Sequence, residues 1–429
     1  MQNRVVVLLL TLLLTISSSN TAAIDTNSQA EPVKNIILLI GDGMGYEHIR
    51  LGSYVEYGND SGMFMQRPEF FQGNVSTRSA DEQITDSAAS ATAIATGYKT
   101  NNGMLGMLPN GTSVQTILEM SESNGKQTGL VTSTFFYHAT PAAFASHKQD
   151  RNAYQQIIPD ILDSGADVIM GGGFHISTYP QLIGLDNLKQ ENNYTQISQK
   201  AELSNLDNST KYLGTFGSGH LPYEADINVN TDIRLHQLAD AALNRLSSSQ
   251  EGFFLMIEGG RIDHAGHEKN YTRDALEVIE FDRTIKLVYD WVKDNPDTLV
   301  LITADHETGG LVIDSTSGLD QNLPQNEPTE SAKQTRRLQR VKQIEASYTA
   351  DYHTSQDVAL FAFGSSIPSL FTQSHYDNTD IFRIMSNAQL GNFEPVETTT
   401  PTTSDTANVL LVPMILIILL PIIKRRKFN

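Results

Sequence analysis

The stretch IILLIGDGMG, at residues 36–45, decides the fold class. Its first five residues are apolar and rich in β-branched isoleucine, which is typical of a central strand in a parallel sheet that is covered on both faces. The glycines that follow allow a tight turn, and they leave Asp42 at the carboxyl end of the strand. Ligands of open α/β sheets bind at that end. A plainer interpretation of this stretch, a turn in which Asp42 caps the next helix, stays open at this point.

The pattern of an apolar strand followed by glycine or a polar residue recurs along the chain. Further strands are expected at residues 129–133, 167–170, 253–257, 298–302 and 358–363. Helices are expected between them, at residues 114–123, 152–162, 231–246 and 272–293, the last with Thr272 as its N-cap. This alternation predicts an α/β fold, a three-layer α/β/α sandwich with a mostly parallel central sheet.

Changes in composition mark the limits of this domain, which we expect to span residues 33–394. Two polar or charged stretches, at about 174–230 and 315–352, break the alternation. We interpret them as insertions over the active face or as surface that contacts a partner. The basic cluster at residues 333–342 lies in the second stretch, and we interpret it as a solvated helix face.

The two ends of the chain have compositions of their own. Residues 1–23 are interpreted as a signal peptide, because a basic residue, a short apolar core and small residues follow one another. Residues 395–408 are rich in threonine and proline and predict a linker. Residues 409–429 are apolar with a basic end, which predicts a hydrophobic anchor or sorting segment. We therefore expect an exported protein, periplasmic or extracellular, that is tethered to the membrane or cell surface at its C-terminus.

The overall charge restricts the partners of the protein. Lysine and arginine total 30 against 49 aspartates and glutamates, a net charge of −19, which disfavours nucleic acid as a partner. The same charge would repel a phosphate substrate unless bound metal ions reverse the local field. The chain has no cysteine, so any metal site must use histidine and carboxylate ligands.

Ser87 lies in the segment TDSAAS, at residues 85–90, which an alanine-rich run and Gly97 follow. Alanine favours a helix and glycine ends one, so this segment predicts a short helix with Asp86 or a close neighbour as N-cap. The first turn of a helix has unpaired backbone N–H groups that suit an anion. Ser87 is therefore either an ordinary residue of a helix start or a nucleophile for a phosphate.

Carboxylate and imidazole groups follow several of the expected strands. Asp263 and His267 are spaced i,i+4, which places both side chains on one face of a helical turn. Other such residues at strand ends or before the last strand are Asp42, Glu258, Asp305, His306 and His353. Charges that converge in a protein interior are costly without partners. We therefore expect metal ions there, zinc where aspartate and histidine combine and magnesium where all ligands are oxygens.

These residues lie in motifs that resemble those of the alkaline phosphatase family, over roughly residues 35–364. The motifs are DGMG at residues 42–45, TDSAAS at 85–90, ATPAA at 139–143, EGGRIDH at 258–264 and TADH at 303–306. Each motif is modestly specific by itself. Their order and their positions at strand ends make the resemblance strong.

The resemblance implies a metal-dependent enzyme that hydrolyses small phosphate monoesters through a phosphoserine on Ser87, and that is a homodimer. It also implies two zinc ions and one magnesium ion. One zinc would be bound by Asp42, Asp305 and His306, and the other by Asp263, His267 and His353. The magnesium would be bound by Asp42, Thr140 and Glu258.

The resemblance also implies roles for residues around these ligands. Arg151 lies at the family's spacing after Thr140, and it would bind two phosphate oxygens in a bidentate fork while Asp86 orients it. His138 and His264 occupy positions beside the magnesium site where enterobacterial members have aspartate and lysine. His138 would bind the third metal either directly or through a water.

Two other functions fit parts of the sequence. A phosphodiesterase of the wider superfamily would reuse the metal ligands, but Arg151 favours monoesters because its fork needs two free phosphate oxygens. A membrane-tethered adhesion protein or a phosphate-scavenging protein would have lost the nucleophile or a metal ligand, whereas each of these is present in the chain.

Overall fold

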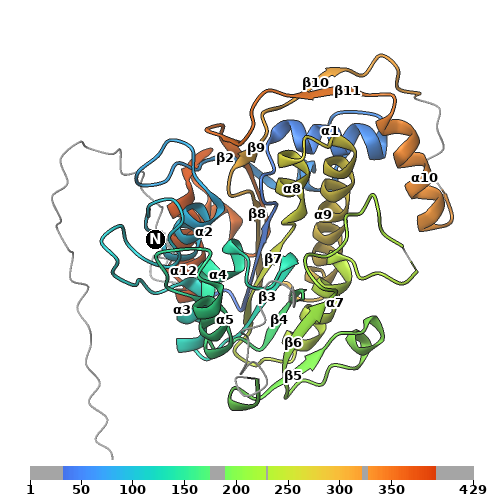
Figure 1. Cartoon of the computed structure of the whole chain (residues 1–429). Helices are drawn as coiled ribbons and strands as arrows, with labels where there is room; N and C mark the ends of the chain where they lie inside the picture. The colour runs from blue at the N-terminus through green and yellow to red at the C-terminus, as the bar shows by residue number, and fades with distance from the viewer. Residues whose placement is uncertain (1–31, 174–188, 229, 321–326, 393–429) are drawn as a thin grey trace, which may run out of the picture. The chain divides into compact units, whose positions relative to one another are not determined.

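The predicted central strand lies in the interior of a large sheet. In the computed structural model, which describes residues 32–173, 189–228, 230–320 and 327–392, β1 (Asn35–Ile40) belongs to a ten-stranded sheet (Figure 1). It pairs in parallel with β7 (Phe253–Glu258) on one side and with β8 (Thr298–Thr303) on the other. Every residue of these three strands is buried. The expectation of a central parallel strand covered on both faces is therefore confirmed.

The sheet is mostly parallel, as predicted. Its strands follow the order β14-β2-β13-β8-β1-β7-β3-β4-β6-β5. The strands not yet given are β2 (Phe71–Ser76), β3 (Gln127–Phe135), β4 (Val168–Gly172), β5 (Tyr194–Ile197), β6 (Lys211–Phe216), β13 (Val358–Gly364) and β14 (His375–Asp377). Among the described strands of this ten-stranded sheet, β13 is the one that runs antiparallel to its neighbours, β8 and β2. The carboxyl ends of the parallel strands therefore lie along one edge.

Helices cover both faces of the sheet, which gives the predicted three layers (Figure 1). On one face lie α2 (Ser87–Thr96), α3 (Ile117–Ser123), α4 (Ala139–Ala145), α5 (Tyr154–Asp163) and α12 (Asn378–Leu390). On the other lie α1 (Tyr46–Tyr57), α7 (Leu235–Leu246), α8 (Arg261–His267), α9 (Tyr271–Val292) and α10 (Glu330–Val341). The short α11 (Ile367–Leu370) follows β13.

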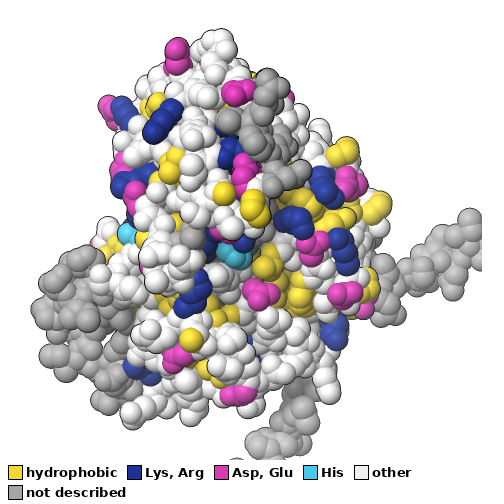
Figure 2. Space-filling view, turned by 90° about the vertical axis from the view of Figure 1, so that its right-hand side faces the viewer, with side chains coloured by type: hydrophobic (Ala, Val, Ile, Leu, Met, Phe, Trp, Pro, Cys, Tyr) yellow, Lys and Arg dark blue, Asp and Glu magenta, His cyan; other side chains and the backbone are white. Residues whose placement is uncertain are grey.

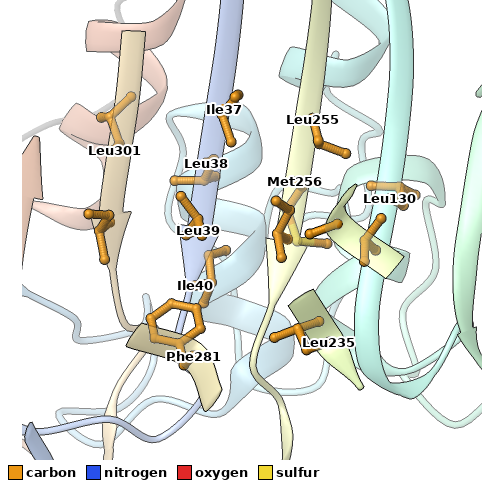
Figure 3. Packing of buried hydrophobic residues seen from close by; sticks show 14 of the residues in the cluster. Ile37, Leu38, Leu39, Ile40, Leu130, Leu235, Leu255, Met256, Phe281 and Leu301 are labelled. Carbon is orange, nitrogen blue, oxygen red and sulfur yellow. The ribbon is translucent and has the colours of Figure 1, made fainter. Parts of the chain in front are cut away.

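The core lies between the sheet and these helices. Figure 3 shows apolar side chains of β1, β3, β7 and β8 beside one another, with Leu235 of α7 and Phe281 of α9 in the same cluster. Successive side chains of a strand point to opposite faces, so Leu38 and Leu39 contribute to the packing on different sides of the sheet. Both are fully buried. Burial of a leucine stabilises the fold by about 1.5–3 kcal/mol.

Several helix boundaries differ from the predicted ones by one to four residues. α9 begins at Tyr271, and its N-cap is Asn270, whose side chain accepts a hydrogen bond from the backbone N–H of Arg273. The expected N-cap Thr272 lies inside the helix. Residues 231–234 precede α7 rather than beginning it. The contact of the Asn270 side chain fixes the start of α9, and periodicity alone does not specify such boundaries.

The two stretches that break the alternation contain secondary structure of their own. In the first, β5 and β6 extend the sheet beside β4, and both pair in parallel. In the second, β11 (Glu345–Tyr348) pairs with β10 (Leu311–Ser315), which directly precedes the stretch, and α10 lies between them in sequence. Residues 174–188, 229 and 321–326 lie outside the described residues.

The interpretation of the basic cluster as a solvated helix face is wrong for three arginines of α10. Arg336, Arg337 and Arg340 are buried. Nε of Arg337 donates to Glu56 over 2.6 Å, and Nε of Arg336 donates to Glu327 over 2.9 Å. The arginines pack against α1 because the carboxylate of Glu56, at its C-terminal end, compensates their charge. On the face that carries α7, α9 and α10, basic and acidic side chains lie interspersed with hydrophobic ones (Figure 2).

The predictions for both ends of the chain lie outside the described residues. They are the signal peptide at residues 1–23, the linker at 395–408 and the hydrophobic segment at 409–429. Among the helices that the structure describes, none combines the length and apolar character that crossing a membrane requires.

The central position of β1 generates a prediction about stability. Leu38→Ala leaves a cavity in a core that is fully buried, and we expect the free energy of unfolding to fall by about 2–5 kcal/mol. Urea-induced unfolding followed by circular dichroism measures this loss. A loss below about 1 kcal/mol would show that β1 is less tightly packed than the structure has it.

Candidate active site

Ser87 is the first residue of α2, and its helix begins and ends as the sequence predicts. Asp86 is the N-cap, and its carboxylate accepts a hydrogen bond from the backbone N–H of Ala89 over 2.9 Å. Gly97 ends the helix in the left-handed conformation, with φ of 78°. The Ser87 side chain is nearly buried, with 2% exposed. The hydroxyl therefore lies at the positive end of a helix that is fixed at both termini.

Arg151 lies beside this helix start. Its Nη1 donates to Oδ2 of Asp86 over 2.9 Å, and its backbone N–H donates to the carbonyl of Gly103. Burial opposes the charge of Arg151, but Asp86 and then Asp42 hold its pKa above the usual value. A charged guanidinium is thus held in a fixed orientation next to Ser87.

The carboxyl ends of the parallel strands bring the predicted metal ligands together. Asp42 follows β1, Glu258 ends β7 and Asp305 follows β8. His353 begins β12 (His353–Thr354), which pairs with β9 (Glu307–Thr308). Asp263 and His267 come from α8, and His138 and Thr140 come from the start of α4. Every one of these residues is therefore supplied by a strand end or by a helix next to one.

Three side chains form one candidate metal site: Asp263, His267 and His353. Nε2 of His267 lies 3.3 Å from Oδ1 of Asp263, and Nε2 of His353 lies 3.5 Å from the same oxygen. The two Nε2 atoms are 3.2 Å apart. Two imidazole nitrogens and one carboxylate oxygen that face a common point are a donor set typical of zinc.

A second group lies around His306 and Ser87. Nε2 of His306 lies 3.2 Å from Oδ2 of Asp305, 3.5 Å from Oδ1 of Asp42 and 3.1 Å from the Ser87 hydroxyl. The ligand atoms that group together here belong to Asp42, Asp263 and His306, although the resemblance assigned Asp263 to the first site and Asp305 to this one. The Asp263 carboxylate thus lies between the two groups.

A third group consists of Asp42, His138 and Glu258. Thr140, which the resemblance implies as a ligand, is fully buried beside them, and its hydroxyl partly offsets the rise that burial causes in the pKa of Glu258. The ring of His264 lies 5.5 Å from that of His138, and its Nδ1 lies 2.8 Å from Nη1 of Arg261. His138 is therefore one of the candidate ligands in this group, whereas His264 lies outside it.

The buried charges of these groups fit bound cations. Within the described residues, neither carboxylate oxygen of Asp42 has a hydrogen-bond partner, and Oε1 of Glu258 has none either. Burial raises the pKa of Asp42 well above its usual value, and repulsion from Asp305 and other carboxylates adds to this. Burial likewise raises the pKa of Glu258 to about 7. Such groups are costly in a protein interior unless a cation compensates them.

One residue of this site gave no signal in the sequence. The hydroxyl of Thr308 donates to Oδ1 of Asp263 over 2.6 Å and lies 3.2 Å from Nδ1 of His306. It therefore connects the first and second groups, and it leaves Nε2 of His306 to face Ser87. Thr308 follows the recognised motif by two residues, and it lies on β9 opposite His353.

Comparisons with known proteins agree with this geometry. The family model for alkaline phosphatase matches residues 33–338. The chain belongs to the alkaline phosphatase family. Alkaline phosphatase 4 of Bacillus subtilis is 34% identical over 314 residues, which cover 71% of this chain and 67% of the relative. The alkaline phosphatase of Escherichia coli is 30% identical over 356 residues, which cover 70% of this chain and 75% of the relative.

Solved structures of alkaline phosphatases have the same fold. The cold-active enzyme of a psychrophilic Shewanella is 30% identical, with a TM-score of 0.69, and the match covers 83% of this chain and 99% of that one. The enzyme of the Antarctic bacterium TAB5 is 26% identical, with a TM-score of 0.69, and the match covers 84% of this chain and 99% of that one. The chain is therefore a metal-dependent phosphatase that acts on phosphate monoesters.

The position of Thr308 generates a prediction about metal affinity. Thr308→Val keeps the shape of the side chain but removes the hydrogen bond to Asp263, so we expect zinc affinity to fall by about 10–100-fold. Thr308→Ser keeps the hydroxyl and is the matched control, with affinity close to that of the unaltered protein. Competition with a chromophoric chelator measures the zinc affinity of both variants. Equal zinc affinity of the two variants would contradict this role.

Proposed function

We propose that this alkaline phosphatase transfers the phosphoryl group of a monoester to Ser87 and then to water, with two zinc ions and one magnesium ion bound. The observation that carries the proposal is the position of the Ser87 hydroxyl at the start of α2, 3.1 Å from Nε2 of His306 and beside the pair of Asp86 and Arg151. A nucleophile, a cation for the phosphate and ligands for metals therefore meet in one place.

The metal ions are assigned to the three groups of ligands. One zinc would be held by Asp263, His267 and His353. The other would be held by Asp42, Asp305 and His306. The magnesium would be held by Asp42, Thr140 and Glu258, with His138 and His264 nearby. When bound, zinc lowers the pKa of a hydroxyl or a water and stabilises charge on the transferring phosphoryl oxygens.

The protein's own residues bind and orient the phosphate. Arg151 uses Nη1 to bind Asp86, so its other N–H groups are available for two phosphate oxygens. The Asp86 carboxylate is itself fixed by the backbone N–H groups of Ala89 and Gly103. The Ser87 oxygen attacks phosphorus and the alcohol leaves. Water then attacks the phosphoserine and restores the Ser87 hydroxyl, so the configuration at phosphorus is retained.

A fork that contacts two phosphate oxygens favours monoesters. A diester has only two non-bridging oxygens, and these two would have to contact both Arg151 and the metal ions. The rate ratio of a monoester to a diester separates this proposal from a phosphodiesterase, which would prefer the diester. A phosphate-binding protein without catalysis would bind phosphate but turn over neither.

Removal of the nucleophile tests the proposal. We expect Ser87→Ala to lower the turnover of p-nitrophenyl phosphate about a thousandfold or more, because no covalent intermediate can form. Ser123→Ala, at the exposed end of α3, is the control with unchanged turnover. Acid-quenched labelling with radioactive phosphate should give phosphoserine in the control and none in Ser87→Ala. Full activity of Ser87→Ala, or of protein treated with a chelator, would refute the proposal.

His138 is proposed to set the metal of the third group. One solved structure of the TAB5 enzyme is that of a mutant in which a histidine is replaced by aspartate, with magnesium bound in its M3 site. An aspartate at position 138 would give this group ligands that are all oxygens, which suits magnesium better than imidazole does.

The aspartate variant of His138 gives a test. We expect His138→Asp to bind magnesium about tenfold more tightly or better, as measured by isothermal titration of zinc-loaded protein. His220→Asn, which alters a neighbouring ring outside the three groups, is the control. If His138→Asp left the affinity for magnesium unchanged, the third metal would have to bind elsewhere.

The location and assembly of the enzyme are also proposals. We infer export with cleavage after residue 23, tethering through residues 409–429 and a homodimer. Amino-terminal sequencing of the mature protein, cell fractionation and light scattering test these three points separately.

A further inference from the structure

Three aromatic rings form a column at the edge of the site. The ring of His306 stacks on that of His353, with centroids 3.5 Å apart and planes at 17°. The ring of Tyr352 stacks on the opposite side of His353, with centroids 3.9 Å apart and planes at 11°. Tyr352 also lies 5.5 Å from the ring of His267. It therefore contacts both imidazoles of the first metal group and is the outermost ring of the column.

The backbone fixes the position of Tyr352. Its carbonyl accepts a hydrogen bond from the N–H of Gly309 over 2.9 Å, directly after β9. The next residue, His353, pairs with Thr308 in the two-stranded ladder of β9 and β12. The preceding residue, Asp351, forms an ion pair with Lys269. A ring held in this way loses little further freedom when a ligand contacts it.

The exposure of Tyr352 shows that one face of its ring is available. The residue is 49% exposed, although His353 covers one side of the ring. Because one face of the ring is covered, we assign this exposure to the other face and the edges of the ring. Ile84 is exposed as well, and it precedes Thr85, whose carbonyl lies 2.8 Å from Nδ1 of His353. Apolar surface is thus exposed beside a site that is otherwise acidic.

Contacts between neighbouring segments place Tyr352 near the phosphate-binding pair. The ring of His353, on which Tyr352 stacks, lies with its Nδ1 2.8 Å from the carbonyl of Thr85, the residue before Asp86. The Asp86 carboxylate in turn accepts a hydrogen bond from Arg151. A monoester whose phosphate binds to Arg151 would extend its alcohol part toward the open side of the site, where Tyr352 lies.

We propose that Tyr352 is a specificity-determining residue, whose open face stacks on a flat aromatic group in the alcohol part of a bound phosphate monoester. This inference rests on the proposed function. The favoured substrates are aryl phosphates and nucleoside monophosphates, and aliphatic monoesters gain nothing from the ring. Stacking of a base on an aromatic side chain is tolerant of the identity of the base, because every base has a π face.

A purely structural role makes a different prediction. If Tyr352 served only to hold His353 in place, its removal would impair the hydrolysis of every monoester by the same factor. A specificity role changes the ratio of two substrates that differ only in the aromatic group. Adenosine 5′-monophosphate and ribose 5-phosphate are such a pair, because both are esters of a primary ribose hydroxyl and only one carries a base.

The experiment compares kcat/KM for this pair in the full-length, metal-loaded protein and in Tyr352→Ala and Tyr352→Phe. We expect Tyr352→Ala to lower the ratio of adenosine 5′-monophosphate to ribose 5-phosphate about tenfold, and Tyr352→Phe to keep it within about twofold. Tyr98→Ala, which removes another exposed tyrosine, should leave the ratio unchanged. Inhibition constants of phenylphosphonate and methylphosphonate give the same comparison for binding without turnover, and their ratio should change in parallel.

The outcomes separate this inference from the proposed function. An unchanged ratio in Tyr352→Ala, with both esters hydrolysed, would overturn the role of Tyr352 and leave the phosphoserine mechanism intact. A ratio that falls equally in Tyr352→Phe would overturn stacking as the cause. Absence of turnover of both esters by the unaltered, metal-loaded protein would overturn the proposed function itself.

Discussion

The whole site depends on the burial of several carboxylates at the carboxyl ends of neighbouring parallel strands. Asp42 after β1, Glu258 at the end of β7 and Asp305 after β8 are each fully buried. Burial raises the pKa of all three, and repulsion from Asp305 raises the pKa of both Asp42 and Glu258 further. An apolar sheet can support such a cluster in its ionised form only if positive charge compensates it. The same requirement explains why an enzyme with a net charge of −19 can bind phosphate.

Much of the architecture follows from local sequence patterns. The apolar runs before Asp42, Glu258 and Asp305 predicted strands that the structure confirms as β1, β7 and β8. The helix that begins at Ser87 was also predictable, because its N-cap and its final glycine are both strong local signals. The ends of parallel strands meet at one edge, so the approximate place of the site followed from the fold class.

Other features depend on contacts between distant segments, and the sequence could not predict them. The arginines of α10 are buried because Glu56, at the C-terminal end of α1, lies opposite them. No local sequence pattern distinguishes Thr308 or Tyr352, because it is the pairing of β9 with β12 that brings them beside the candidate metal ligands. His138 was predicted to lie near the third metal, but only the three-dimensional arrangement places it in one group with Asp42 and Glu258.

The central claim is that cations occupy the space between these side chains, and anomalous X-ray scattering at the zinc absorption edge tests it most directly. A crystal grown without a chelator should give two zinc peaks. One should lie about 2.1 Å from Nε2 of both His267 and His353, and the other at the same distance from Nε2 of His306, next to the Ser87 hydroxyl. A map without a peak at either position, in a protein that hydrolyses phosphate monoesters, would contradict the account.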